Sequence, residues 1–290
     1  MPRRLITVTL SWNRRSDQMI YLPRLPGESL AFSIEQMFYL QAYKPEHERE
    51  RLVPDGSINL VIELDDRHRY IYDNDTQAPI QLCTGAWVSG MQQGYFFIST
   101  PETELMAVRF HPAGCYPLFH LPIHILNNKV VPAQEVFGES ILHLRQSLLL
   151  CPSGEEKLEM LEQWLLAQLR PEQMPPAEIL EAVRKITHNP TISHLKEIIE
   201  QTHFSQKHFI HLFKKYVGLS PKAFQRIKRF SEAFPKIQAR QQIQWAQLGI
   251  DCGYYDQAHF IKDFKHFSGY NPQDFWEEGH DRLNFFPQQS

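Results

Sequence analysis

The sequence predicts an α+β protein, with an antiparallel β-barrel or sandwich in its N-terminal part and an all-α domain in its C-terminal part. Three observations predict this fold class. Short β-like runs fill the chain to about residue 135, apolar residues take helical spacing from Glu139 onward, and one helical pattern recurs after 51 residues. With 290 residues, 42% of them hydrophobic, the chain is long enough to bury two cores.

The N-terminal part consists of short runs rich in β-branched and aromatic residues. They are Ser57–Leu64, Gln81–Val88, Tyr95–Ser99 and Leu105–Phe110. Turn-forming residues separate the runs, at Pro54–Gly56, Asp73–Asp75, Ser89–Gly90 and Pro101. Many short strands with regular breaks are typical of an antiparallel sandwich or barrel.

A helical hairpin and a linker follow. Ile141–Leu150 and Glu155–Arg170 have helical spacing and are separated by the break Cys151–Gly154. Pro171–Pro176 has the composition of a linker, and the chain after Ala177 is helical in pattern. We therefore divide the chain into a β-rich domain at 1–138, a hairpin at 139–170 that is a candidate for dimerisation, a linker at 171–176 and a helical domain at 177–290.

An internal repeat organises the helical domain. The stretch Phe213–Phe224 reappears 51 residues later as Phe264–Phe275, with Phe, Lys, an aromatic residue, Gly, Pro and Phe in register. Upstream, Gln206, His208, Phe209 and Ile210 correspond to Gln257, His259, Phe260 and Ile261. Agreement at so many uncommon residue types indicates two copies of one structural unit.

Each copy predicts an amphipathic helix with defined ends. One apolar face is formed by Phe209, Leu212, Phe213 and Tyr216, and its repeat by Phe260, Phe264 and Phe267. Ser205 and Asp256 stand at N-cap positions, and Gly218 and Gly269 at C-terminal stops. A shorter helix precedes each copy across a tight turn, the first starting at Thr191 or Ser193. This is the helix-turn-helix arrangement, with units at about 191–217 and 243–268.

Charge is distributed unevenly between the two parts. The whole chain has a net charge of −3, but residues 184–276 hold 14 of its 30 Lys and Arg and 7 of its 33 Asp and Glu, a net of +7 against −10 elsewhere. A basic region on an acidic body favours a polyanionic partner. A plain helical bundle is the alternative. Glutamine and lysine on both outer faces favour double-stranded DNA, because they hydrogen bond to base edges and phosphates.

At these residues the sequence resembles the AraC/XylS family of transcription regulators, over roughly residues 178–276. The motifs that carry the resemblance are Ser205–Phe209, Leu212–Lys215, Gly218–Pro221, Gly253–Phe260, Phe264-Lys265 and Gly269–Pro272. The resemblance implies a seven-helix tandem helix-turn-helix domain, a linker helix from about Pro221 to Arg240, and sequence-specific transcription control.

The resemblance also implies which side chains meet DNA. Base contacts are expected from Lys207, Ile210, His211, Gln257, Ala258, Ile261 and Lys262. Phosphate contacts are expected from Ser205, Gln206, Lys214, Lys215, Arg226, Lys228, Arg229 and Lys265. For the linker cluster Arg226, Lys228 and Arg229, intramolecular salt bridges are the alternative.

The chain departs from the family pattern at three positions of the helical domain. His203 replaces the turn glycine of the first unit, and histidine tolerates positive φ better than β-branched residues do. Gly249 replaces a helical alanine of the second unit. Pro235 falls inside the expected linker helix and should kink or end it near Phe234.

The first domain resembles the N-terminal domain of an AraC subgroup of unknown ligand, through Arg51–Val61 and Met106–Gly114. This resemblance implies a cupin-like β-barrel or sandwich and allows gating by a small-molecule effector. The effector-binding residues are unknown, and the candidates are Arg51, Asp55, Trp87 and Arg109. Arg109 alternates with apolar neighbours, so solvent exposure is its alternative.

No enzyme, metal or cofactor is expected. The β-like runs contain no H-x-H pair, His111 stands alone, and Pro122 separates His120 from His124. The rival hypotheses are an enzyme in the N-terminal domain, and basic helices that bind an acidic protein instead of DNA. The four cysteines form no C-x-x-C pair and no apolar run is long enough to span a bilayer, so a cytoplasmic protein is expected. Its expected partners are DNA, RNA polymerase, an effector and a second copy, with no membrane.

Overall fold

The computed structural model describes residues 19–45, 47–191, 195–238 and 243–278. The expected helix start at Ser193, the expected linker end at Arg240, and the outer ends of the first and last domains lie outside these residues.

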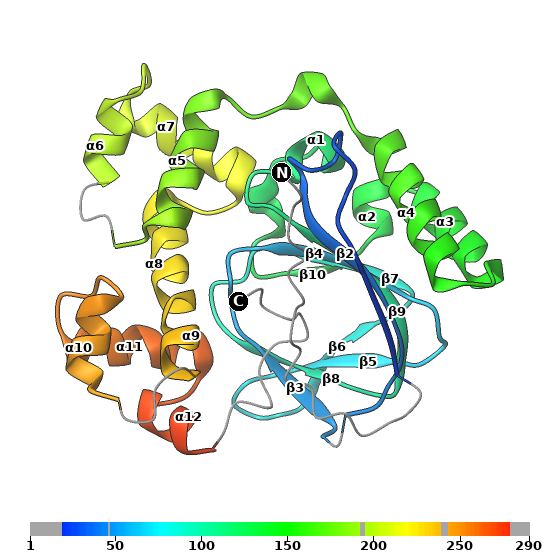
Figure 1. The fold of residues 1–290 in the computed structure, drawn as a ribbon, viewed down its shortest axis with the longest axis horizontal. Helices are drawn as coiled ribbons and strands as arrows, with labels where there is room; N and C mark the ends of the chain where they lie inside the picture. The colour runs from blue at the N-terminus through cyan, green and yellow to red at the C-terminus, as the bar shows by residue number, and fades with distance from the viewer. Residues whose placement is uncertain (1–18, 46, 192–194, 239–242, 279–290) are drawn as a thin grey trace, which may run out of the picture.

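The N-terminal domain consists of two antiparallel sheets. The larger has the order β1-β2-β9-β4-β7-β10, and the smaller β3-β8-β5-β6. Their bounds are β1 Ile20–Arg24, β2 Ile34–Tyr43, β3 Arg49–Leu52, β4 Ile58–Glu63, β5 Arg69–Tyr72, β6 Pro79–Cys83, β7 Ala86–Ser89, β8 Phe96–Ser99, β9 Thr103–Phe110 and β10 Val130–Pro132. The sheets stay open and face each other (Figure 1), so the sandwich alternative is confirmed.

Alternation along the strands gives the larger sheet two apolar faces. In β4, Val61 joins the core between the sheets, whereas Leu60 and Ile62 join the core on the opposite face. That opposite face is covered by α1 Tyr116–Phe119, η1 Ile123–Leu126, α2 Gln134–Phe137, α3 Ser140–Leu150 and α4 Gly154–Gln168. The α3–α4 pair confirms the predicted hairpin. A Cβ on Gly154 would lie 2.5 Å from the Tyr39 ring, so α4 begins directly on β2.

One predicted strand is wrong. The run Gln81–Val88 is divided between β6 in the smaller sheet and β7 in the larger one. The chain crosses between the sheets at Thr84-Gly85, where Gly85 has a φ of 68°. Both halves are rich in apolar residues, so composition did not indicate that the chain changes sheets between them.

The C-terminal domain is helical, after the short helix η2 Pro171–Gln173. Its helices are α5 Ala177–His188, α6 Leu195–Glu200, α7 Gln206–Val217, α8 Pro221–Ser231, α9 Ala233–Gln238, α10 Trp245–Asp251, α11 Gln257–Ser268 and α12 Pro272–Glu278. The described residues of this domain thus form eight helices, α5–α12, where seven were expected, because the linker helix is broken at Glu232. Pro235 has no N–H to donate to the Ser231 carbonyl, so the break lies one turn before the proline rather than at Phe234.

The duplicated helices have the predicted ends. α7 and α11 are both 12 residues long. The Ser205 side chain accepts a hydrogen bond from the His208 N–H, and the Asp256 carboxylate from the His259 N–H. Gly218 and Gly269 end the helices with φ of 103° and 75°. The equal length and caps confirm the repeat that the sequence predicts.

We expect each N-cap to contribute about 1 kcal/mol to the free energy of unfolding, because it satisfies an otherwise unpaired N–H of the first turn. Ser205→Ala and Asp256→Ala should each lower the melting temperature of the full chain by roughly 2–4 °C. Ser205→Asn keeps an acceptor and should melt like the parent. Unchanged melting of both alanine variants would contradict the capping role.

Candidate nucleic-acid interface

The first helix-turn-helix unit consists of α6, a turn and α7. In the turn, the Thr202 hydroxyl donates to the Ile199 carbonyl over 2.7 Å and accepts from the Phe204 N–H over 3.3 Å. His203 does not take the positive φ that its position suggested. The threonine hydroxyl bridges the turn instead, so no left-handed residue is needed there.

The second unit consists of α10, a turn and α11, and its turn does use glycine. Gly253 has a φ of 81°, and a Cβ at this position would lie 2.8 Å from the Thr191 Cα. In α10, a Cβ on Gly249 would meet the Phe260 Cβ at 3.1 Å. The glycine that replaces the helical alanine therefore lets α10 approach α11 closely.

The apolar faces of the two recognition helices lie in the core as predicted. Phe209 and Phe213 of α7 are buried, and so are Phe260, Phe264 and Phe267 of α11. The same burial pattern in both copies fixes which face of each helix is left for a partner.

The residues expected to read bases lie on the outer faces. Lys207, His211, Gln257, Ala258 and Lys262 are exposed, and Ile210 and Ile261 are half-buried. The structure therefore brings the first set together on α7 and the second on α11, at the ends nearest the N-caps. Their contact with bases stays a prediction.

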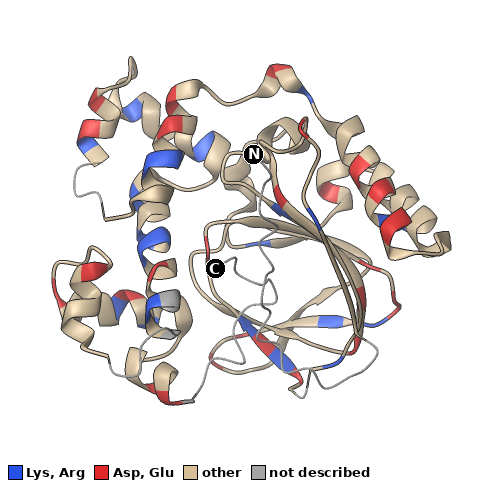
Figure 2. Cartoon of the chain, viewed as in Figure 1, with Lys and Arg blue, Asp and Glu red and all other residues tan. Residues whose placement is uncertain are grey.

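The expected phosphate-contacting residues fall into two groups. Ser205, Gln206, Lys214 and Lys265 are exposed around the recognition helices. Lys215 is half-buried, with its Nζ 4.9 Å from the Tyr116 ring centre and 5.1 Å from that of Tyr216. Figure 2 shows Lys and Arg along α8, and mainly Asp and Glu on α4.

The linker cluster on α8 is engaged within the protein. The Arg226 guanidinium donates to both carboxylate oxygens of Asp263 on α11, at 2.6 and 3.2 Å. These hydrogen bonds raise the pKa of Arg226 above its usual value. The Arg229 Nε donates to the Pro190 carbonyl at 2.9 Å, and the Lys228 Nζ to the Asp55 carbonyl at 2.7 Å. In this arrangement the intramolecular alternative holds for Arg226, and each of the three has a partner within the protein.

The effector candidates do not form one site. Arg109 is nearly buried and lies 3.0 Å from the Glu35 carboxylate and 2.7 Å from that of Asp55, so its solvent alternative is wrong. Burial opposes ionisation of the Asp55 carboxyl, but Arg109 and Lys228 hold its pKa below the usual value. Burial lowers the pKa of Lys228. Arg109 therefore belongs to an ionic cluster at the domain boundary.

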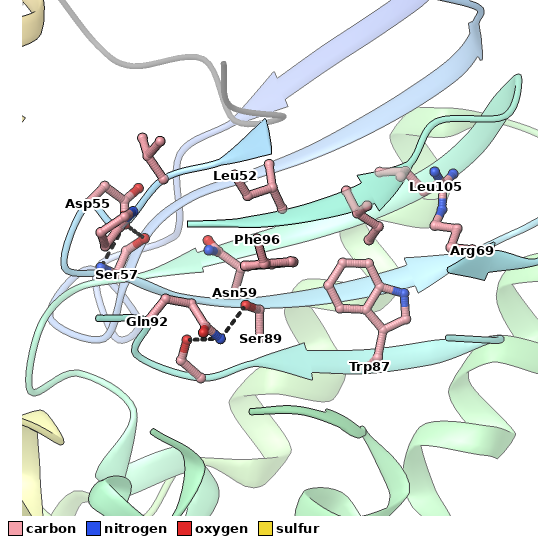
Figure 3. Close-up of a pocket in the computed structure, with 14 residues that line it drawn as sticks. Leu52, Asp55, Ser57, Asn59, Arg69, Trp87, Ser89, Gln92, Phe96 and Leu105 are labelled. Atoms are coloured by element: carbon pink, nitrogen blue, oxygen red, sulfur yellow. Dashed lines mark hydrogen bonds between the residues drawn. The ribbon is translucent and has the colours of Figure 1, made fainter. Parts of the chain in front are cut away.

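A cavity of about 50 Å³ lies between the two sheets (Figure 3). Its apolar lining includes Leu52, Val53, Trp87, Phe96, Ile98 and Leu105, and its polar lining Asp55, Ser57, Asn59, Arg69, Ser89 and Gln92. Two of the four effector candidates, Asp55 and Trp87, line it. Asn59 was not among the predicted candidates, although its alternation with Val61 on β4 indicates that it lies on the face between the sheets.

Among the described residues, no three His, Cys, Asp or Glu side chains are grouped so that they can hold a metal ion. No helix within the described ranges has both the length and the apolar character required to cross a bilayer.

Comparison with known families matches two regions. Residues 23–132 match a family described as "Domain of unknown function (DUF6597)", and residues 198–278 match "Helix-turn-helix domain". An uncharacterised HTH-type transcriptional regulator of Haemophilus influenzae is 29% identical over 83 residues. That match covers 28% of this chain, and the chain spans only 27% of the relative's length. The predicted helix-turn-helix domain is confirmed.

The solved structures that match the chain include several of ToxT from Vibrio cholerae. One is 10% identical with a TM-score of 0.39 and covers 79% of this chain and 96% of that one. Another, with an unsaturated fatty acid bound, is 12% identical with a TM-score of 0.40 and covers 83% and 96%. TM-scores this low do not establish a shared fold.

The ion pair between Arg226 and Asp263 should fix the second unit on α8. Asp263 is 3% exposed, so Arg226→Met leaves a buried carboxylate without its guanidinium and should cost about 1–3 kcal/mol of unfolding free energy. Lys222→Met, on the exposed face of α8, is the matched control and should cost little. Urea denaturation of the full chain measures both.

The double variant Arg226→Met with Asp263→Leu should recover most of the loss, because apolar side chains can replace a buried ion pair without penalty. A double variant as unstable as the sum of the two single variants would show that the two side chains act independently.

Proposed function

We propose that this chain, whose C-terminal region belongs to the AraC type of helix-turn-helix domain, is a sequence-specific DNA-binding transcription regulator. The observation that carries the proposal is the duplicated unit. α7 and α11 are both 12 residues long, have equivalent caps and leave equivalent faces exposed. Two such faces on one helical frame suit a duplex, which offers successive equivalent grooves.

In this proposal each recognition helix enters a major groove, and successive grooves on one side of the duplex lie about 34 Å apart. Lys207, Ile210 and His211 read one groove. Gln257, Ala258, Ile261 and Lys262 read the other. The Gln257 amide matches the donor and acceptor of adenine, and Lys262 can donate to guanine. The apolar side chains suit thymine methyl groups.

Phosphate contacts come from the ends of the recognition helices rather than from the linker. Ser205, Gln206, Lys214 and Lys265 are exposed there. We leave Arg226, Lys228 and Arg229 out of the phosphate set, because their donors already bind Asp263, Asp55 and Pro190. The affinity for DNA therefore depends on few cations and should respond moderately to salt.

The N-terminal domain is the sensing part in this proposal, and the cavity between its sheets supports a small-molecule effector. The α3–α4 hairpin is the proposed contact with a second copy. RNA polymerase is the proposed protein partner at a promoter, which places the protein in the cytoplasm. We propose no catalytic role for the domain.

Base contacts can be tested by mobility shift with a site selected from random duplexes. Gln257→Ala and Lys262→Ala should each weaken binding to the preferred site by about 5- to 150-fold, the equivalent of about 1–3 kcal/mol, and relax the preference at one base pair. Binding to unrelated duplex should change little. If neither variant alters the base preference, the assignment of α11 is wrong.

Phosphate contacts have a different signature. Lys265→Ala and Lys214→Ala should weaken binding to all duplexes alike and reduce the slope of log affinity against log salt by about 1 each. Arg229→Ala should leave this slope unchanged, since its guanidinium binds the Pro190 carbonyl. A reduced slope for Arg229→Ala would return the linker to the phosphate set.

A further inference from the structure

The N-terminal domain holds both recognition helices at their C-terminal ends. The Asn127 amide donates to the Gly218 carbonyl at the end of α7 over 2.6 Å. The Arg51 guanidinium donates to the Ser268 carbonyl at the end of α11 over 2.8 Å. These carbonyls belong to the last turn, where helices lack internal donors. Both helix ends are therefore completed by the other domain.

The second of these contacts is reinforced by packing. The Arg51 guanidinium lies 3.7 Å from the Tyr270 ring centre, just beyond the end of α11. A Cβ on Gly269 would lie 2.5 Å from the Tyr95 ring, so this glycine admits the tyrosine. The end of α11 is thus enclosed by β3 and the residue before β8.

Segment 51–57 also holds the linker helix. Lys228 of α8 donates to the Asp55 carbonyl, and a Cβ on Gly56 would lie 2.9 Å from the Lys228 Cε and 3.1 Å from the Phe224 ring. Gly56 has a φ of 78°, so the turn and the close approach both require glycine. One short segment therefore contacts α8 and the end of α11.

The other face of the same segment lines the cavity. Leu52, Val53, Pro54, Asp55 and Ser57 all belong to the lining, and Figure 3 shows Asp55 and Ser57 at one end of it. Residues 53–57 lie outside both sheets, between β3 and β4. This wall lacks the ladder hydrogen bonds that hold the strands. It is held instead by the Asp55–Arg109 ion pair and by its contact with α8, so a change in this wall acts on α8.

A further part of the lining leads to the first unit. Gln92 lines the cavity, and its amide donates to the Lys129 carbonyl at 3.2 Å. A Cβ on Gly90 would lie 1.9 Å from the Leu126 carbonyl oxygen, so these backbones are in direct contact. Asn127, which holds α7, lies within this stretch. The cavity lining therefore adjoins both segments that hold the two units.

We infer that this cavity binds a small uncharged molecule and that its occupancy changes the spacing of the two recognition helices through segment 51–57. This inference rests on the proposed function only where it implies a change in DNA binding. The coupling itself is a property of contacts within the chain.

The lining selects an uncharged ligand with an apolar body and a hydrogen-bond donor. Its charged groups are already paired, Asp55 with Arg109 at 2.7 Å and Arg69 with Glu63 at 2.6 Å. The Asn59 Oδ1 is buried in the cavity without a hydrogen-bond partner. Trp87, Phe96 and Leu105 supply apolar surface. A hydroxyl or N–H group would satisfy Asn59, whereas a carboxylate would not.

The small volume of the cavity explains how a bound ligand would move segment 53–57. At roughly 10–15 Å³ per water-sized sphere, a cavity of about 50 Å³ holds only a few atoms. A molecule with one aromatic ring must push a wall outward. Displacing residues 53–57 moves Asp55 and Gly56 against Lys228, so ligand binding acts on α8 directly.

Phenol is the probe, because it is uncharged and carries one ring and one donor. Phenol should quench tryptophan fluorescence of the full chain to a saturating level. Of the five tryptophans, Trp87 lines the cavity, so Trp87→Phe should abolish the saturable quenching. Asn59→Leu conserves volume without the acceptor and should weaken phenol binding by about 3- to 10-fold, the worth of one hydrogen bond. Absence of saturable binding would overturn the ligand class.

Hydrogen exchange without DNA measures the coupling. Phenol should change exchange in residues 221–231 and 264–270 by about 5-fold or more, within the usual range of allosteric coupling. Arg51→Leu with Lys228→Met should bind phenol but lose this change. The control double variant, Arg51→Leu with Lys222→Met, replaces an exposed lysine of α8 instead of Lys228. It should retain part of the phenol-induced change in exchange.

Phenol binding that leaves exchange in these residues unchanged would overturn the coupling. Because no DNA is present, that failure is distinct from failure of the proposed function. If the unmodified chain does not bind DNA, the proposed function is wrong, whereas the hydrogen-exchange result remains valid.

Discussion

The arrangement of the C-terminal domain depends on the partners that α8 finds for its charged side chains. A charged group removed from water costs several kcal/mol unless an opposite charge or hydrogen bonds replace the solvent. Three residues close together on α8 bind three different parts of the protein. Arg226 binds the second unit at Asp263, Arg229 binds the loop before the first unit at Pro190, and Lys228 binds the N-terminal domain at Asp55. These three contacts fix the rotation and position of α8 between the two units and the N-terminal domain. A movement of any of these parts therefore disturbs the contact of a charged side chain.

This constraint explains why the predicted break in the linker matters little for the relation of the two units. The break at Glu232 follows Ile227 and Phe230, which are buried, and all three charged contacts lie before it. The part of the linker that sets geometry is thus the intact α8. α9 then leads toward the second unit, where the Lys236 Nζ donates to the Asp251 carbonyl at the end of α10 over 2.9 Å.

Local features were predictable from the sequence, and contacts between distant residues were not. The caps of Ser205 and Asp256, the glycine stops and the apolar faces depend on neighbours within one helix, so their spacing carries the information. The partners of Arg51 and Lys228 lie 217 and 173 residues away, and no periodicity indicates them. Basic residues on a helix have the same pattern whether they face phosphate or a buried carboxylate, which is why the linker cluster had two interpretations. Arg109 shows the same limit, because alternation identifies the face of a strand but not what covers it.

The stretches Arg51–Val61 and Met106–Gly114, singled out in the sequence, have a common location in the structure. Arg51, Asp55 and Gly56 contact α11 and α8, and Arg109 forms the ion pair that holds Asp55. Of this set only Asp55 lines the cavity. The same stretch Arg51–Val61 also supplies Leu52, Val53, Pro54, Ser57 and Asn59 to the cavity lining. The motif Arg51–Val61 therefore both lines the cavity and, through Arg51, Asp55 and Gly56, docks the helical domain on the N-terminal domain. The same docking geometry can then serve cavities with different linings, because the ligand is selected on one face of the segment and the response is transmitted by the other.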